Sequence, residues 1–168
     1  MSAPKDDCPE WADELGEYAD RFVELLNEPE ALLQALRADL DFQIAAARAD
    51  TVPKVQSWFP ARDAGFQVFR EHSGPVGPVA VGTEWSYQGD HSRDDTFNGM
   101  RATGKPIELR GYTIMSVGSD DPDGSAKLQS RRYVDWAGLY GQLGLTIDWR
   151  VPVAAPKGKK PRARKRAD

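Results

Sequence analysis

The chain has 168 residues, of which 40% are hydrophobic and 29% are charged, a composition that predicts one domain able to bury a core and enclose a pocket. Its single cysteine, Cys8, excludes an internal disulfide and a multi-cysteine metal site. The sequence has no long uncharged apolar run, which excludes a membrane span, and its first residues lack the apolar segment of a signal peptide. We therefore expect a cytoplasmic protein without membrane contact.

The formal net charge of −4 conceals an uneven distribution. Seven basic residues against Asp168 give residues 157–168 a charge of +6, so residues 1–156 carry −10. A tail built from Lys, Arg, Pro, Gly and Ala buries too little apolar surface to offset its ordering entropy, and we expect residues 154–168 to be disordered. The tail either contacts a polyanion or lies on the acidic body. We favour the second interpretation, because no aromatic side chain is present to stack on bases.

The N-terminal part of the chain predicts two helices. After a flexible leader at residues 1–8, Pro9 is suited to open a helix, and apolar residues from Trp11 onward repeat at helical spacing to about Asn27. Asn27 and Pro29 are suited to begin a second helix. The leucines of its buried face are Leu32, Leu33, Leu36 and Leu40.

The middle of the chain carries weaker patterns. Residues 42–47 alternate loosely and predict a short strand, while residues 48–60 contain two prolines and predict a loop. Residues 61–72 return to helical spacing and predict a third helix. Two prolines and two glycines in residues 73–78 end that helix.

The C-terminal half predicts β-structure. Residues 79–88 alternate with a period of two, and a long polar loop at 89–106 leads to a second strand at 107–117. An Asp-, Pro- and Gly-rich turn at 119–125 then predicts an antiparallel hairpin with a strand at 126–135. Helices followed by antiparallel strands indicate an α+β fold, with helices packed on one face of a curved sheet.

Asp135 stands where the last strand passes into a short apolar helix that ends at Gly144. A carboxylate at such a junction is either a pocket acid or the N-cap of the helix, and the local sequence favours neither. A carboxylate that removes a carbon-bound proton needs an apolar setting and a donor for the enolate oxygen. Asp135 is therefore the leading catalytic candidate.

The side chains on either side of Asp135 alternate between the two faces of the sheet. We expect Tyr133 and Arg131 to lie with Asp135 on the concave side, and Arg132 and Trp136 to face away. Tyr133 is placed to donate to an oxyanion, or to pack across strands. Arg131 either orients a substrate carboxylate or ester or forms a rim salt bridge, and we favour the salt bridge.

Four further residues are candidates for the site. Trp85 and Tyr87 share one strand face and line either the core or the mouth of a pocket, with the core favoured for Trp85. The face of Tyr112 is undecided, because its strand alternates weakly. His91 lies in the polar loop and is either exposed or a second proton-transfer group. With His72 it is one of only two histidines, and no metal-ligand spacing is present, so we expect no metal site.

Two motifs carry a family resemblance. The first spans residues 97–106, beginning Phe97-Asn98-Gly99, and the second runs from Tyr133-Val134-Asp135 through residues 138–144. Together they resemble the SnoaL-like polyketide cyclase and ester cyclase family of the nuclear-transport-factor-2-like superfamily. The resemblance is good over residues 83–145. It implies one cone-shaped domain over residues 9–153, in which N-terminal helices close a curved sheet, and a homodimer formed through the sheet.

The resemblance also implies a cofactor-free enzyme in which Asp135 acts as general acid/base. In the cyclases, this aspartate removes a proton next to a carbonyl group and supports an intramolecular aldol closure of a polyketide ester. His91 matches the histidine that precedes the family's Phe-x-Gly motif. The linker at residues 92–95 is longer and more charged than in the family, and the chain before Phe97 is shorter, which leaves the pocket shape open.

These observations predict an acid/base enzyme, a cyclase or isomerase, that acts on a small, largely apolar or polyketide-like carbonyl compound through Asp135. One alternative is epoxide opening by activated water, which requires Arg131 and a second acid within hydrogen-bond reach of Asp135. Another is a non-catalytic small-molecule-binding or assembly module on the same cone. In that module Asp135 serves only as a helix cap.

Overall fold

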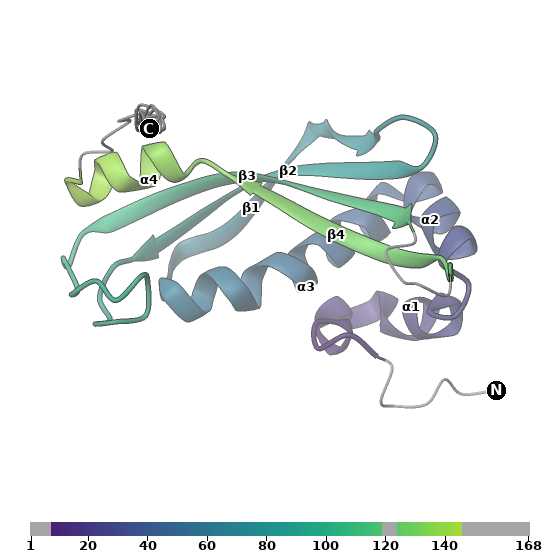
Figure 1. Ribbon diagram of the computed structural model, residues 1–168, viewed down its shortest axis with the longest axis horizontal. Coiled ribbons are helices and arrows are strands. Elements are labelled where there is room, and N and C mark those ends of the chain that lie inside the picture. The colour runs from purple at the N-terminus through teal and green to yellow at the C-terminus, as the bar shows by residue number, and fades with distance from the viewer. Residues whose placement is uncertain (1–7, 119–123, 146–168) are drawn as a thin grey trace, which may run out of the picture.

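The computed structural model describes residues 8–118 and 124–145, and it confirms the α+β class predicted from the sequence. Helices come first in the chain and are followed by a curled antiparallel sheet, one face of which they cover (Figure 1). The basic tail at 154–168 and nearly all of the predicted leader lie outside the described residues. None of the helices in the described part combines the length and apolar character that a membrane crossing requires.

Five helical elements and four strands make up the described chain. The four strands form one sheet in the order β1-β2-β3-β4, and every neighbouring pair is antiparallel. The elements are η2 (Ala12–Tyr18), α1 (Ala19–Leu25), α2 (Pro29–Ala38), α3 (Leu40–Trp58), β1 (Ala61–Pro75), β2 (Ala80–Asp90), β3 (Pro106–Gly118), β4 (Lys127–Val134) and α4 (Trp136–Leu143).

The sheet has a helix-covered face, against which α3 packs, and an open face (Figure 1). Trp85 of β2 and Thr113 of β3 point to the helix-covered face, where the hydroxyl of Thr113 contacts Thr51 of α3. The next residues along the strands, Glu84 and Tyr112, point to the open face because side chains alternate along a strand. These two faces set the environment of each candidate site residue.

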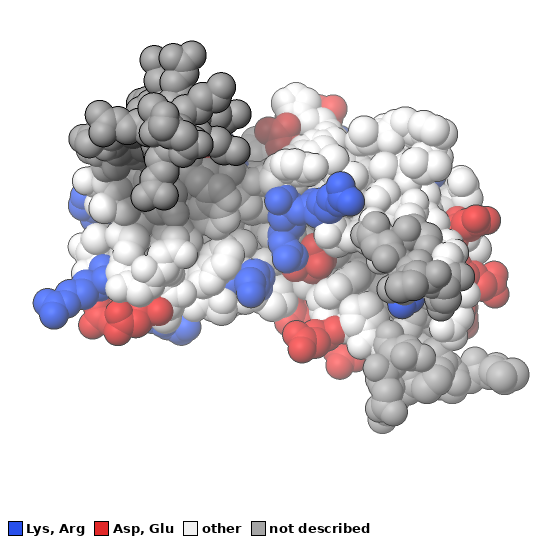
Figure 2. Space-filling view, viewed as in Figure 1, with Lys and Arg blue, Asp and Glu red and all other residues white. Residues whose placement is uncertain are grey.

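The side of the molecule shown in Figure 2 carries both basic and acidic side chains. In the view of Figure 2, basic side chains gather over the middle of β4 and acidic side chains lie beside and below them. This side therefore does not form a uniformly acidic surface, although residues 1–156 together carry −10.

The first predicted helix is present as two elements. A 3₁₀ segment, η2, is followed directly by the α-helix α1, and η2 is itself kinked at Gly16, whose backbone adopts φ 63° and ψ −124°. Only glycine reaches such a conformation without steric cost. The predicted apolar stripe is still present, since the rings of Trp11 and Phe22 lie 4.8 Å apart across the kink.

The predicted strand at 42–47 and the predicted loop at 48–60 are wrong, because residues 42–58 belong to α3. Asp39 caps this helix, and its side-chain oxygen accepts from the amide of Phe42 at 3.0 Å. Pro53 lies within the helix instead of ending it. Buried alanines such as Ala46 let the helix approach the sheet closely, and a run of small apolar residues shows little helical periodicity in sequence.

The predicted helix at 61–72 is also wrong, because these residues form most of β1. Phe66 and Val68 pair with Tyr87 and Trp85 of β2, so they alternate with the period of a strand. Two register shifts interrupt the pairing of β1 with β2, and Gly65 adopts a positive φ near one of them. Bulges of this kind break the simple alternation that identifies a strand from sequence.

Replacing Asp39 by Ala should lower the free energy of unfolding by about 1 kcal/mol, because the cap of α3 is lost. The hydrogen bond from the Phe42 amide, together with Arg21, holds the pKa of the Asp39 carboxyl below its usual range. A carboxyl with a lowered pKa stabilises the fold above its unfolded-state pKa and loses this contribution as the pH falls through its folded-state pKa. Urea unfolding of both proteins at pH 7 and pH 3 should show a smaller difference at pH 3, and an unchanged difference would contradict the assignment.

Candidate functional site

Asp135 lies directly after β4 and caps α4. Its Oδ1 accepts from the amide of Gly138 at 2.9 Å, and its own amide donates to the carbonyl of Arg110 at 2.9 Å. Gly138 leaves the space that the carboxylate occupies, since a Cβ atom at position 138 would collide with it. The helix ends at Gly144 in the left-handed conformation. The strand-to-helix junction predicted from the sequence is confirmed, and Asp135 has the capping bond.

Asp135 borders a shallow depression of about 290 Å³ on the open face of the sheet. Strand pairing explains how it forms, because Tyr112 is opposite Glu84 of β2 on one side and opposite Tyr133 of β4 on the other. We call this the tyrosine depression, and it is lined by Glu84, Arg110, Gly111, Tyr112, Tyr133, Val134 and Asp135. Three of the predicted site residues, Asp135, Tyr133 and Tyr112, therefore share one surface.

The phenol of Tyr112 remains a proton donor over a wide pH range. Burial, followed by the negative charge of Glu84, raises the pKa of Tyr112 above its usual range. The phenol lies over Gly82, where a Cβ atom would collide with it, so a larger residue at that position would displace the phenol. Glu84 is itself held by His72 of β1, whose Nδ1 lies 2.7 Å from the carboxylate.

The predicted orientation of the last strand is wrong. Arg132 points to α3, where Nη1 donates to the backbone oxygen of Asp50 at 2.6 Å and to its Oδ2 at 2.9 Å. Tyr133 is on the open face and is 56% exposed. Tyr133 and Asp135 do line one surface as expected, but that surface lies opposite the helices. Arg131 is exposed and does not line the tyrosine depression.

Trp85 and Tyr87 lie in the core on the helix-covered face, and neither side chain is more than 1% exposed. The indole of Trp85 donates to the hydroxyl of Thr113 at 2.9 Å. The phenol of Tyr87 donates to the carbonyl of Phe59 at 2.7 Å. The core interpretation of Trp85 is confirmed, and neither ring reaches the tyrosine depression.

His91 is fully buried beneath the loop between β2 and β3. Its Nδ1 accepts from the amide of Thr103 at 3.2 Å, and its ring packs edge-on against Phe59. Among the residues that the structure describes, Nε2 of His91 has no hydrogen-bond partner. The polar loop is present as predicted, but it encloses His91 instead of exposing it. His91 therefore lies apart from the tyrosine depression.

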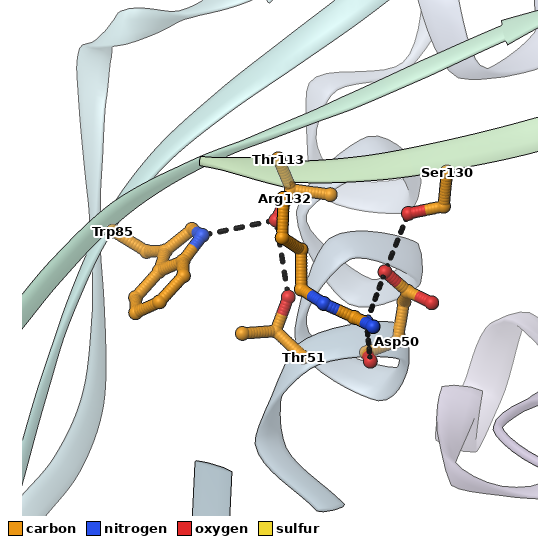
Figure 3. Close-up of polar contacts among 6 residues, drawn as sticks. All are labelled: Asp50, Thr51, Trp85, Thr113, Ser130 and Arg132. Carbon is orange, nitrogen blue, oxygen red and sulfur yellow. Dashed lines mark hydrogen bonds and ion pairs between the residues drawn. The ribbon is translucent and has the colours of Figure 1, made fainter. Parts of the chain in front are cut away.

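The sequence interpretation missed a second group of polar residues on the helix-covered face (Figure 3). Thr51 of α3 and Thr113 of β3 share a buried hydrogen bond of 3.1 Å, and Thr113 also receives the Trp85 indole. Next to them, the Asp50 carboxylate accepts from the Ser130 hydroxyl at 2.5 Å and from Arg132. Asp50 and Thr51 were missed because residues 48–60 were predicted as a loop. A correct prediction of a helix there would have placed both residues on one element facing the sheet.

Comparison with known proteins does not assign the chain to a family. No family model matches it, and no curated protein matches it. Among solved structures it is similar to a candidate polyketide cyclase from Acidithiobacillus ferrooxidans, with 26% sequence identity and a TM-score of 0.38. The similarity covers 60% of this chain and 62% of that chain, so this chain spans less than two thirds of that structure.

Proposed function

We propose that the protein is a cofactor-independent acid/base enzyme that acts on a small, largely apolar carbonyl compound, as polyketide and ester cyclases and isomerases do. Asp135 would act as the base. The observation that supports this function best is that Asp135 borders the same depression as Tyr112 and Tyr133. The motif resemblance around residues 97–106 and 133–144 points to the same reaction class.

The proposed reaction begins with transfer of a carbon-bound proton from the substrate to the Asp135 carboxylate. The electron pair of the broken C–H bond moves onto the neighbouring carbonyl oxygen, and a phenol hydrogen bond stabilises this enolate. Tyr133 suits that role, because it precedes Asp135 by two residues and faces the same side of the sheet. In a cyclase, the enolate carbon then attacks a second carbonyl of the same molecule, and the new alkoxide takes up the proton that Asp135 removed, which returns the carboxylate to its ionised form.

The two tyrosine rings also supply a surface for the substrate. An apolar compound lying on them displaces water from Asp135, and a less hydrated carboxylate is a stronger base. Glu84 lies at the far side of the same depression and is held by His72, so it provides a second acidic group. The depression is shallow, which suits a small substrate.

Exchange of the acidic α-proton of ethyl 2-methylacetoacetate in D₂O tests this proposal, because it reports proton removal without requiring ring closure. The protein should accelerate loss of the α-proton signal in ¹H NMR spectra above the rate in buffer alone. Bovine serum albumin at equal concentration controls for nonspecific base catalysis. A rate equal to that of the albumin control would contradict the proposal.

The epoxide alternative has no supporting contact at Asp135. It requires an arginine and a second acid at that carboxylate, but within residues 8–118 and 124–145 the Asp135 side chain bonds to the Gly138 amide and to no other group. The arginine that lines this depression, Arg110, pairs with Glu108 at 3.0 Å, and the Asp50–Arg132 pair lies on the helix-covered face of the sheet.

A non-catalytic binding module is a second candidate, and the capping bond of Asp135 to Gly138 favours it. If the Asp135 carboxylate serves only to cap α4, it takes no part in proton transfer. The two candidates predict different outcomes of the exchange experiment. A binding module would show saturable shifts of tyrosine signals with no acceleration of proton loss, whereas the enzyme would show both.

A further inference from the structure

A second hollow, of about 350 Å³, lies between α3 and the N-terminal segment. We call it the α3 hollow, and its lining includes Trp11, Asp50, Pro53, Lys54 and Arg132. It has no lining residue in common with the tyrosine depression. Any ligand of the α3 hollow is therefore separate from the substrate proposed above.

Arg132 lines this hollow, and its guanidinium is held against Asp50 (Figure 3). Its Nη1 is held by the backbone oxygen and the carboxylate of Asp50, and that carboxylate is only 8% exposed. In the described part of the chain, Nη1 is the only nitrogen of Arg132 with a hydrogen bond, and the side chain is 33% exposed. The edge formed by Nε and Nη2 can therefore donate two parallel hydrogen bonds to a ligand. Because Nη1 already holds the side chain in place, binding costs little further side-chain entropy.

The remaining charges of the hollow select the charge of a ligand. Lys54 follows Asp50 by one turn of α3, and among the described residues its ammonium forms no ion pair. Asp50 offsets Arg132, and Glu10 at the same hollow offsets Lys54, so the four side chains have no net formal charge. Such a site accommodates one negative charge opposite Arg132 and Lys54 but repels a multiply charged phosphate at the carboxylates.

We propose that the α3 hollow binds a small monocarboxylate with a flat apolar body. The ligand's carboxylate accepts two hydrogen bonds from the free edge of Arg132, and its apolar part lies against Trp11 and Pro53. The arrangement combines a bidentate donor with an aromatic wall, which is how protein sites distinguish carboxylates from simple anions. No step of the Asp135 reaction depends on this site.

Titration of the full chain with benzoate tests the proposal. The indole N–H signal of Trp11, assigned from its loss in a Trp11→Phe variant, should shift saturably in ¹H–¹⁵N NMR spectra. Benzamide, which has the same shape without the charge, and inorganic phosphate should each give no saturable shift. Absence of a saturable shift with benzoate, or equal shifts with benzamide, would overturn the proposal.

Substitution of adjacent arginines localises the contact. Arg132→Lys keeps a positive charge beside Asp50 but removes the two-pronged edge, so benzoate affinity should fall about tenfold, a loss of about 1.4 kcal/mol. Arg131→Lys is the matched control, and its affinity should be unchanged. If Arg132→Lys does not fold, Lys54→Gln should still weaken benzoate binding about threefold, since Lys54 is exposed. Equal losses at Arg131 and Arg132, or no loss in Lys54→Gln, would contradict the proposal.

Discussion

Replacing Asp135 by Asn should lower the rate of enzyme-catalysed α-proton exchange by about 10³-fold, because an amide cannot accept the proton. Asn is as good a helix N-cap as Asp, so the bond from the Gly138 amide is retained and the free energy of unfolding should change by less than about 0.5 kcal/mol. The exchange rate and a urea unfolding curve, measured on the same preparation, separate these two effects.

Asp94→Asn is the matched control for this substitution. Asp94 is also an exposed carboxylate that accepts one backbone hydrogen bond, from the amide of Ala102 at 2.7 Å, but it lies outside the tyrosine depression. Its exchange rate should equal that of the wild type. Wild-type exchange in Asp135→Asn, or an equal loss in Asp94→Asn, would rule out Asp135 as the base.

Replacing Arg132 by Met should lower the free energy of unfolding by about 2–3 kcal/mol, because the carboxylate of Asp50 is left buried without its ionic partner. The expected loss is below that for a fully buried pair, since the Arg132 side chain is 33% exposed and water screens part of the interaction. Urea unfolding at pH 7 measures this change.

The double variant Asp50→Asn, Arg132→Met distinguishes loss of the ion pair from loss of packing. Removing both charges should recover more than half of the stability lost in Arg132→Met, because no unpaired charge remains buried. A double variant no more stable than the single variant would show that the Asp50–Arg132 pair is not the cause.

The β-strands of the C-terminal half could be predicted from the sequence because large apolar residues alternate with small or polar ones over residues 79–88, and because an Asp-, Pro- and Gly-rich turn separates the last two strands. The predicted strands at 79–88, 107–117 and 126–135 correspond to β2, β3 and β4 with bounds shifted by a residue or two. The strand-to-helix junction at Asp135 could also be predicted from the sequence, because an N-cap residue and a helix-ending glycine act through local backbone geometry.

The elements in the middle of the chain could not be predicted, because tertiary contacts decide them. Helix α3 packs small side chains against the sheet and contains Pro53, so its sequence lacks the usual helical stripe. Strand β1 is interrupted by two register shifts, and Phe66 and Val68 fit either spacing until β2 is present to pair with them.

Of the seven predicted site residues, Asp135, Tyr133 and Tyr112 line the tyrosine depression and the other four do not, and the side of the sheet on which the depression lies was not predicted. The alternation of side chains along the last strand correctly placed Tyr133 on the face opposite to Arg132. It does not indicate which of the two faces the helices cover. A charged residue such as Arg132 is usually taken to face water, and only the carboxylate of Asp50 on α3 makes its inward orientation favourable. Because Asp50 lay in a predicted loop, this partner was not recognised.

The measurement that tests the location of the site most directly is a ¹H–¹⁵N NMR titration of the wild-type protein with ethyl 2-methylacetoacetate. If the ester binds at Asp135, the backbone amide signals of Gly138, Tyr133 and Tyr112 should shift together and saturate at one ligand concentration. Shifts confined to Trp11, Asp50 and Lys54 in the α3 hollow, with Gly138 unchanged, would contradict a site on the open face of the sheet.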